Sequence, residues 1–266
     1  MDKNSFIGVF DSGVGGLGVV NTLLKILPTE NYLYVADSSN YPYGTKTEEE
    51  IKKFSERVVW HLIGKNVKAI VVACNTVSSV AIPRLKEIAG EIPVFGMIQS
   101  GSKLALRVSE NLKIGVISTP LTAKSHAYKK EILRLNKNAE VLEVGSQELV
   151  NLVEDGNQSN KYAYTLAQRK LSGIIESGAD TLILGCTHFP FLYKVVKKVV
   201  GNDMKIVDPA YGVGNELKNY LQNRNLLSES EDPTRLFFTT GDKQTFLEKA
   251  KIFLNIDVKN VKHLDI

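Results

Sequence analysis

The chain has 266 residues, which is enough for one large α/β domain or for two smaller ones. Hydrophobic residues make up 43% and charged residues 23%, a balance that excludes a disordered or fibrous protein and indicates a folded, water-soluble one. The net charge of +4 comes from basic residues scattered among acidic ones, so the charge pattern does not indicate a nucleic-acid partner.

The N-terminal sequence MDKNSFIGVFDSG lacks the basic region, apolar stretch and cleavage site of a signal peptide. No later apolar run reaches the roughly 18 residues needed to span a bilayer. The two cysteines are too few for a disulfide framework. We therefore expect a cytoplasmic protein with no membrane partner and with unpaired cysteines.

Nine short apolar runs rich in β-branched residues predict strands, and most are separated by helical patterns. Strands alternating with helices predict parallel sheets covered by helices on both faces. The predicted strands are residues 5–10, 32–36, 68–73, 93–97, 113–117, 140–144, 180–185, 205–208 and 235–240.

Three helices are predicted from amphipathic patterns and from their end signals, over residues 15–27, 48–65 and 158–177. Thr47 and Glu50 form the pattern of a capping box at the start of the second helix. Gly178 follows the third helix, where a left-handed residue commonly ends a helix.

One arrangement of strand, polar turn and cysteine occurs twice along the chain. FIGVFDSG at 6–13 is matched by KIGVISTP at 113–120, and VKAIVVACNT at 67–76 is matched by ADTLILGCTH at 179–188. Open parallel sheets bind ligands at the carboxyl ends of their strands, so each half should hold its turn and its cysteine at one edge.

The repeat predicts an α/β fold of two pseudo-symmetric lobes, each a mostly parallel sheet flanked by helices, with the active site in the cleft between them. The first lobe is predicted to comprise residues 1–97 plus 208–266 and to carry Asp11 and Cys74. The second lobe is predicted to comprise residues 98–207 and to carry Cys186 and His188.

The segment DSGVGGLG at 11–18 predicts a tight turn between a strand and a helix. Its backbone amides would suit an anion such as a phosphate or a carboxylate. It is neither a P-loop nor a dinucleotide-binding pattern, because the required lysine and glycine spacings are absent. The adjacent carboxylate of Asp11 and hydroxyl of Ser12 favour a substrate-binding role over a plain structural turn.

Cys74 and Cys186 admit four interpretations. Either cysteine could be a small buried hydrophobe, although their matching repeat positions argue against that. Both could bind zinc together with His188, but no C-x-x-C or H-x-x-x-H spacing is present. Cys186 with His188 could form a Cys–His hydrolase site, but that leaves Cys74 without a role.

Two opposed thiols account for both cysteines. One thiolate would remove an acidic proton from one face of a substrate carbon, and the other thiol would return a proton to the opposite face, which inverts the stereocentre. A free thiol has a pKa of about 8.5, so each cysteine needs a helper at neutral pH. Asp11 could assist Cys74, and His188 could assist Cys186.

At these residues the chain resembles the glutamate racemases of the aspartate/glutamate racemase superfamily. The resemblance implies interconversion of L-glutamate and D-glutamate without PLP, metal or other cofactor, supply of D-glutamate for peptidoglycan, and a homodimer. It extends over nearly the whole chain and rests on the motifs FDSGVGGLGV, ADSSNYPYGTK, VVACNTVSSVA, GVISTPLTAKSHAY, LVEDG, LILGCTHFP, VDPA and FFTTGDKQTF.

The resemblance also implies roles for individual residues. Cys74 corresponds to the thiol that deprotonates D-glutamate, and Cys186 to the one that deprotonates L-glutamate. Asp11, His188 and Glu154 correspond to assisting catalytic residues. The implied substrate-binding residues are Asp11, Ser12, Pro42, Tyr43, Gly44, Asn75, Thr76, Thr119, Thr122, Thr187 and His188.

The chain departs from the family pattern ahead of LVEDG, where a Cys-Pro pair is replaced by Ser146 and Gln147. This leaves the local packing and the position of Glu154 open. Two rival functions also stay open, namely an aspartate or other amino-acid racemase of the same superfamily and a glutamate-binding protein without catalysis.

Overall fold

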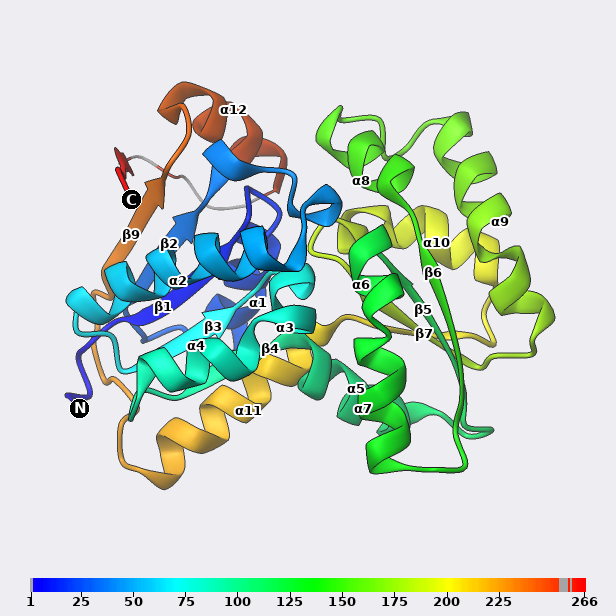
Figure 1. The fold of residues 1–266 in the computed structure, drawn as a ribbon, viewed down its shortest axis with the longest axis horizontal. Helices are drawn as coiled ribbons and strands as arrows, with labels where there is room; N and C mark the ends of the chain where they lie inside the picture. The colour runs from blue at the N-terminus through cyan, green and yellow to red at the C-terminus, as the bar shows by residue number, and fades with distance from the viewer. Residues whose placement is uncertain (1, 254–257, 259) are drawn as a thin grey trace.

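The computed structural model describes residues 2–253, 258 and 260–266. Over these residues the chain forms two lobes that lie side by side, with both chain ends on the first lobe (Figure 1). Each lobe contains one sheet, and every strand pair in both sheets is parallel. The predicted fold class, two parallel sheets flanked by helices, is confirmed.

The first lobe holds a six-stranded sheet in the order β10-β9-β2-β1-β3-β4, and the second a four-stranded sheet in the order β6-β5-β7-β8. All nine predicted strands are present, and β10 is a tenth that the sequence did not predict. The strands are β1 Ile7–Asp11, β2 Tyr32–Ala36, β3 Ala69–Val72, β4 Val94–Gly96, β5 Lys113–Ser118, β6 Glu140–Gly145, β7 Thr181–Gly185, β8 Lys205–Val207, β9 Arg235–Thr239 and β10 Val261–His263.

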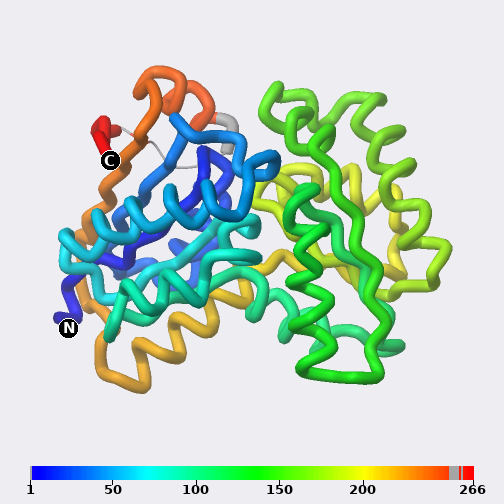
Figure 2. The backbone as a smooth tube through the Cα atoms, viewed as in Figure 1, coloured from blue at the N-terminus to red at the C-terminus, as the bar shows by residue number. Residues whose placement is uncertain are grey.

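Helices connect the strands and cover the sheets, and the backbone tube of Figure 2 follows this alternation along the chain. Three short 3-10 turns are η1 Ser38–Asn40, η2 Tyr43–Thr45 and η3 Phe189–Leu192. The α-helices are α1 Leu17–Ile26, α2 Glu48–Gly64, α3 Asn75–Val80, α4 Ile82–Ala89, α5 Met97–Val108, α6 Pro120–Ser125, α7 Ala127–Leu135, α8 Gln147–Glu154, α9 Lys161–Glu176, α10 Tyr193–Val200, α11 Pro209–Asn223 and α12 Lys243–Phe253.

The three predicted helices are confirmed as α1, α2 and α9, each slightly shorter than expected. The capping box is present, because Glu50 N donates to Thr47 Oγ1 at 3.3 Å and Thr47 N donates to Glu50 Oε2 at 2.8 Å. Gly178 has a φ of +72°, as expected for a left-handed residue after a helix.

The strand order of the two sheets confirms the internal repeat. The order β2-β1-β3-β4 in the first lobe recurs as β6-β5-β7-β8 in the second. β1 and β5 each end in a polar turn, and β3 and β7 are each followed by a cysteine. Asp11 therefore corresponds to Ser118, and Cys74 corresponds to Cys186.

The central strand β1 is buried along its whole length, which explains why its sequence is part of a continuous apolar run. Ile7 and Val9 belong to the hydrophobic cluster that includes residues of α1, whereas Phe10 belongs to the cluster that includes residues of α2. Helices thus cover both faces of the sheet, and only its edges and strand ends are left for function.

Two helices join the lobes. α5 follows β4 of the first sheet but packs against α7 and β7 of the second lobe, whereas α11 follows β8 of the second sheet but packs against α1 of the first. α5 and α11 also pack against each other, and Figure 1 shows α11 beneath the first lobe. The domain division at residues 97/98 and 207/208 stays a prediction.

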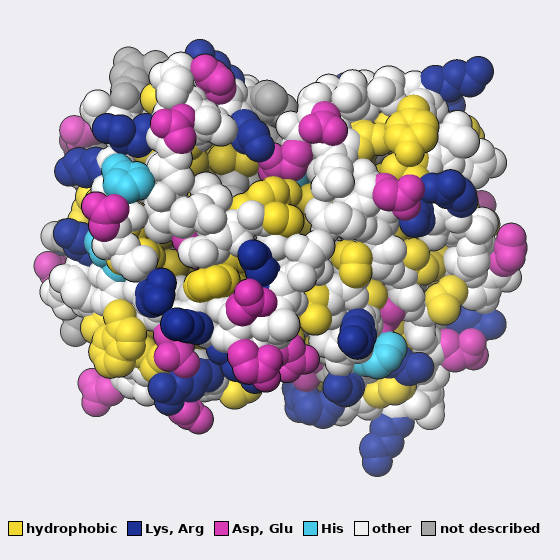
Figure 3. All heavy atoms as spheres, turned by 45° about the horizontal axis from the view of Figure 1, so that its top comes forward, with side chains coloured by type: hydrophobic (Ala, Val, Ile, Leu, Met, Phe, Trp, Pro, Cys, Tyr) yellow, Lys and Arg dark blue, Asp and Glu magenta, His cyan; other side chains and the backbone are white. Residues whose placement is uncertain are grey.

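In the part of the chain that the structure describes, no helix has the length and apolarity needed to cross a membrane. The face drawn in Figure 3 carries acidic and basic side chains intermixed, with no large area of one sign. This agrees with the scattered charges of the sequence.

Candidate active site

A small cavity lies between the lobes at the carboxyl ends of the central strands, and it brings both thiols together. Its volume is about 20 Å³, which is room for a single water molecule. Its lining residues are Ser12, Tyr41, Pro42, Tyr43, Gly44, Cys74, Asn75, Thr76, Thr119, Gln147, Val150, Cys186, Thr187 and His188.

The turn after β1 is organised around the carboxylate of Asp11, which is fully buried. Gly13 N and Gly16 N donate to Asp11 Oδ2 at 3.2 and 3.0 Å. The prediction that these amides bind an external anion is therefore corrected at both glycines, because the chain supplies the anion itself. Asp11 Oδ1 is buried without a hydrogen-bond partner. Burial raises the pKa of Asp11 to about 6, although His188 and the two amides oppose that rise.

Two glycines of this turn are needed because other groups approach them closely. A Cβ at Gly16 would lie 2.4 Å from Asp11 Cβ, so only glycine lets the turn close over the carboxylate. A Cβ at Gly15 would lie 2.6 Å from Thr187 Oγ1 in the other lobe. The glycines of DSGVGGLG thus serve close packing within the turn and between the lobes.

Cys74 lies at the start of α3, close to the turn after β1. Its Sγ donates to Ser12 Oγ at 3.7 Å, and the side chain is buried. Burial and the neighbouring Asp11 carboxylate raise the pKa of the Cys74 thiol to about 12. Cys74 is therefore held as a neutral thiol in this environment.

Cys186 directly follows β7 and has a different environment. Its Sγ lies 3.6 Å from His188 Nδ1, and His188 Nε2 lies 2.6 Å from Glu154 Oε1. Burial disfavours the protonated imidazole, but Cys186 and Glu154 outweigh it and raise the pKa of His188 to about 10. An imidazolium therefore sits between the Cys186 sulfur and a carboxylate at neutral pH.

Glu154, the last residue of α8, is paired on its other side as well. Its Oε2 forms an ion pair with Lys249 Nζ of α12. Burial disfavours the ionised carboxyl, but His188 and Lys249 outweigh it and lower the pKa of Glu154 to about 2. Ser146 caps α8 by accepting from Leu149 N at 3.2 Å, so the departure from the Cys-Pro pattern keeps this helix in place.

Three threonine hydroxyls join the lobes beside the thiols. Thr76 Oγ1 lies 3.0 Å from Thr119 Oγ1, which in turn lies 2.9 Å from Thr122 Oγ1. Thr76 lies in the first turn of α3, whereas Thr119 directly follows β5 and Thr122 lies in α6. Thr76 and Thr119 of this cluster offer hydroxyl groups on one wall of the cavity, and Thr122 lies behind them.

Two tyrosines fix other parts of the wall. Tyr128 OH donates to Asn75 Oδ1 at 2.6 Å, which leaves the amide NH₂ group of Asn75 as the available donor. Tyr43 OH donates to a carboxylate oxygen of Asp37, and this bond holds the η2 turn that carries Gly44.

The structure brings most of the predicted site residues to the cavity, whereas three lie behind its wall. Asp11, Thr122 and Glu154 are not among the lining residues, and each contacts a residue of the wall or of the turn after β1.

Sequence reasoning missed Tyr41, Gln147, Val150 and Lys249. Tyr41 and Gln147 stand next to motif residues and were within reach of the motif pattern. Lys249 carried no signal, because its contact with Glu154 spans 95 residues of sequence.

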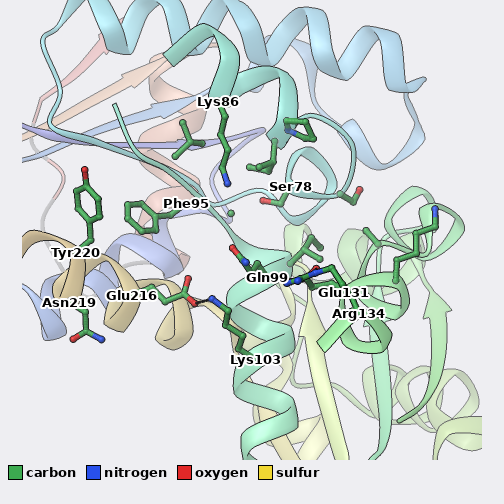
Figure 4. Close-up of a pocket in the computed structure, with 18 residues that line it drawn as sticks. Ser78, Lys86, Phe95, Gln99, Lys103, Glu131, Arg134, Glu216, Asn219 and Tyr220 are labelled. Atoms are coloured by element: carbon green, nitrogen blue, oxygen red, sulfur yellow. Dashed lines mark hydrogen bonds and ion pairs between the residues drawn. The ribbon is translucent and has the colours of Figure 1, made fainter. Parts of the chain in front are cut away.

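A larger cavity of about 890 Å³ lies elsewhere, among α4, α5, α7 and α11 (Figure 4). Lys103, Glu216 and Tyr220 line it, and neither thiol does. Its size does not make it the reaction site, because Cys74, Cys186 and His188 all line the smaller cavity. Within residues 2–253, 258 and 260–266, no three His, Cys, Asp or Glu side chains are grouped to hold a metal ion.

Comparisons with known proteins show the family to which the chain belongs. The family model Asp/Glu/Hydantoin racemase matches residues 8–211. Glutamate racemase 1 of Caldanaerobacter subterraneus is 41% identical over 266 residues, covering 100% of this chain and 97% of the relative.

Solved structures agree as well. A glutamate racemase isoform from Bacillus anthracis superposes with a TM-score of 0.95 at 36% identity, covering 99% of this chain and 98% of that one. The glutamate racemase of Francisella tularensis, solved in complex with D-glutamate, gives 0.93 at 35% identity with the same coverage.

The two-lobed parallel fold, the paired thiols and these relatives together define an amino-acid racemase, an enzyme of the isomerase class. The chain belongs to the Asp/Glu/Hydantoin racemase family.

Proposed function

We propose that this enzyme interconverts L-glutamate and D-glutamate without a cofactor, using Cys74 and Cys186 to remove and return the α-proton. The observation that carries the proposal is that both thiols line one cavity from corresponding positions of two repeated lobes. A substrate carbon held between them would be approached from opposite faces, as inversion requires.

The two sulfurs have differently charged surroundings. His188, protonated at neutral pH, places positive charge 3.6 Å from Cys186 Sγ and stabilises negative charge there. Cys74 is held neutral by burial and by Asp11. Cys186 is thus poised to take the proton of L-glutamate, and Cys74 to deliver one from the other side.

The reverse reaction begins from the exchanged states, with Cys74 taking the proton of D-glutamate. Asp11 is the helper on that side, because its buried Oδ1 is unpartnered and its pKa of about 6 lies near neutrality. Asp11 does not line the cavity of this arrangement, so its predicted contact with the substrate stays a prediction.

The polar groups of the cavity suit a substrate with two carboxylates. Ser12, Thr187, the threonine cluster and the Asn75 amide offer neutral donors, and donors at the α-carboxylate would also stabilise the charge that develops as the α-proton leaves. The similarity to proteins named glutamate racemases supports glutamate rather than aspartate as the substrate.

Substrate entry requires the lobes to separate. A cavity of about 20 Å³ holds one water molecule, and glutamate is much larger. We infer that the structure represents a closed arrangement and that opening about the α5–α11 connection admits the substrate.

The biological setting follows from the family resemblance. We propose a cytoplasmic homodimer that supplies D-glutamate for peptidoglycan, with the domain division given above. Gel filtration with light scattering tests the dimer.

One assay tests the proposed reaction. Purified protein is incubated with L-glutamate or L-aspartate and no added cofactor, and the enantiomers are separated by chiral chromatography. We expect D-glutamate to accumulate to equal amounts of both enantiomers, with little conversion of aspartate. Faster conversion of aspartate would support the rival racemase. Binding of glutamate without α-proton exchange would support the non-catalytic rival.

A further inference from the structure

The ion pair between Lys249 and Glu154 crosses the boundary between the two lobes. Lys249 lies on α12, which follows the last long strand of the first sheet, and Glu154 ends α8 in the second lobe. Figure 1 shows α12 and α8 facing each other across that boundary. The two residues are 95 positions apart in sequence, so the contact exists only through the relative placement of the lobes.

This contact continues without a gap to one of the two thiols. Lys249 binds Glu154 Oε2, the other oxygen of that carboxylate lies 2.6 Å from His188 Nε2, and His188 Nδ1 lies 3.6 Å from Cys186 Sγ. The Glu154 side chain is 10% exposed and that of Lys249 is 36% exposed. The outer end of this series of contacts, at Lys249, is therefore exposed to solvent. Its inner end, at Cys186, lines the substrate cavity.

Few other groups compete for the Glu154 carboxylate. Besides His188 and Lys249, the titratable groups of the described residues that interact with it are Tyr34, Tyr41 and Asp11. A third cavity, of about 150 Å³, adjoins the pair and is also lined by Asp242. Among these groups only Lys249 and His188 can carry positive charge. Because His188 contacts Oε1 of Glu154, Lys249 is the cation that holds Oε2.

We propose that Lys249 is a positioning residue for Cys186: by holding Glu154 from the opposite lobe, it orients His188 against the thiol when the lobes are together. The proposal rests on the two-thiol function above and deepens it. Because its ends lie on different lobes, the ion pair breaks when the lobes open and forms again on closure. Closure and the alignment of Cys186 are thereby linked through one contact.

Kinetics of four variants test this inference. Lys249→Met removes the charge and keeps the length of the side chain, whereas Lys249→Arg keeps the charge. Lys251→Met is the matched control, since Lys251 is exposed on the same helix. Glu154→Gln keeps the shape of the inner partner and removes its charge. Circular dichroism and Tm establish that each variant is folded.

We expect Lys249→Met to lower kcat for glutamate racemisation about five- to tenfold, in line with a partly exposed charge-assisted pair. The KM should change less than about twofold, because Lys249 does not line the substrate cavity. Lys249→Arg should recover most of the activity, and Lys251→Met should match the wild type.

The double variant is decisive. If Lys249 acts through Glu154, then adding Lys249→Met to Glu154→Gln should cost no further activity. A further loss as large as in the wild-type background would overturn the proposal, as would wild-type kcat in Lys249→Met. Absence of glutamate racemisation by the wild-type enzyme would instead contradict the proposed function, so the two failures are distinguishable.

Discussion

Gly15 in the first lobe lies against His188 in the second, so closely that a Cβ on Gly15 would be 2.8 Å from His188 Cε1. The glycine-rich turn of one lobe is therefore the surface on which the histidine of the other lobe rests. His188 is held from this side by Gly15 and from behind by Glu154.

Gly15→Ala should displace His188 or hold the lobes apart. We expect kcat/KM for glutamate to fall at least about tenfold, because small misplacements of catalytic groups are costly. Gly64→Ala is the control, since a Cβ there meets nothing within 4 Å. The measurement is the racemisation rate of both variants. Equal activity of Gly15→Ala and Gly64→Ala would show that the close contact has no catalytic role.

Removal of either thiol should stop interconversion. We expect Cys74→Ala and Cys186→Ala each to lower kcat by at least about 10³-fold, because each variant lacks the proton carrier for one face. Calorimetric titration with D-glutamate should still detect binding, which separates lost chemistry from lost folding. One single variant that keeps near-full activity would refute the paired-thiol mechanism.

The protonation of His188 should make stability depend on pH in the alkaline range. Its pKa is raised from 6.5 to about 10 in the folded protein, so its stabilising contribution is complete below pH 6.5 and is lost as pH rises through about 10. Urea unfolding of the wild type and of His188→Gln at pH 6 and pH 10.5 measures this. The stability difference between them should shrink by at least about 1 kcal/mol. A difference independent of pH would mean that His188 is not charged in the folded state.

The buried ion pair of Lys68 and Glu30 should matter for folding and not for catalysis. Lys68 Nζ lies 2.5 Å from Glu30 Oε2, and both side chains are fully buried. Lys68→Met should cost about 3–5 kcal/mol, because it leaves an unpaired buried carboxylate. Lys3→Met, which removes the exposed partner of Glu229, is the control and should leave Tm unchanged. Equal Tm values for both variants would contradict this reading of the pair.

Much of the fold could be predicted because its local signals agree with one another. The strands of a doubly covered parallel sheet are continuous apolar runs, and the capping box at Thr47 and the glycine at 178 mark helix ends through local backbone chemistry. β10 was missed because it spans only three residues, Val261–His263, of which two are exposed. Nothing in so short and polar a segment distinguishes an edge strand from a loop.

The site was predictable where the repeat pointed to it and not where contacts cross the lobes. Cys74 and Cys186 stand at matching positions, so the sequence could pair them. The hydrogen bonds from the Gly13 and Gly16 amides to Asp11 were missed. A turn whose amides bind an external anion and a turn whose amides bind a carboxylate of the chain itself have the same glycine pattern. The Lys249 contact depends on how two lobes meet, which no local pattern encodes.

Racemisation in D₂O tests the central claim most directly. L-glutamate with protium at the α-carbon is incubated with the enzyme, and both enantiomers are separated early in the reaction and examined by NMR or mass spectrometry. The thiol that returns the proton exchanges with solvent, so the account predicts deuterium at the α-carbon of the D-glutamate formed, while unreacted L-glutamate keeps its protium. D-glutamate that still carries the original protium would contradict proton return by the opposite thiol.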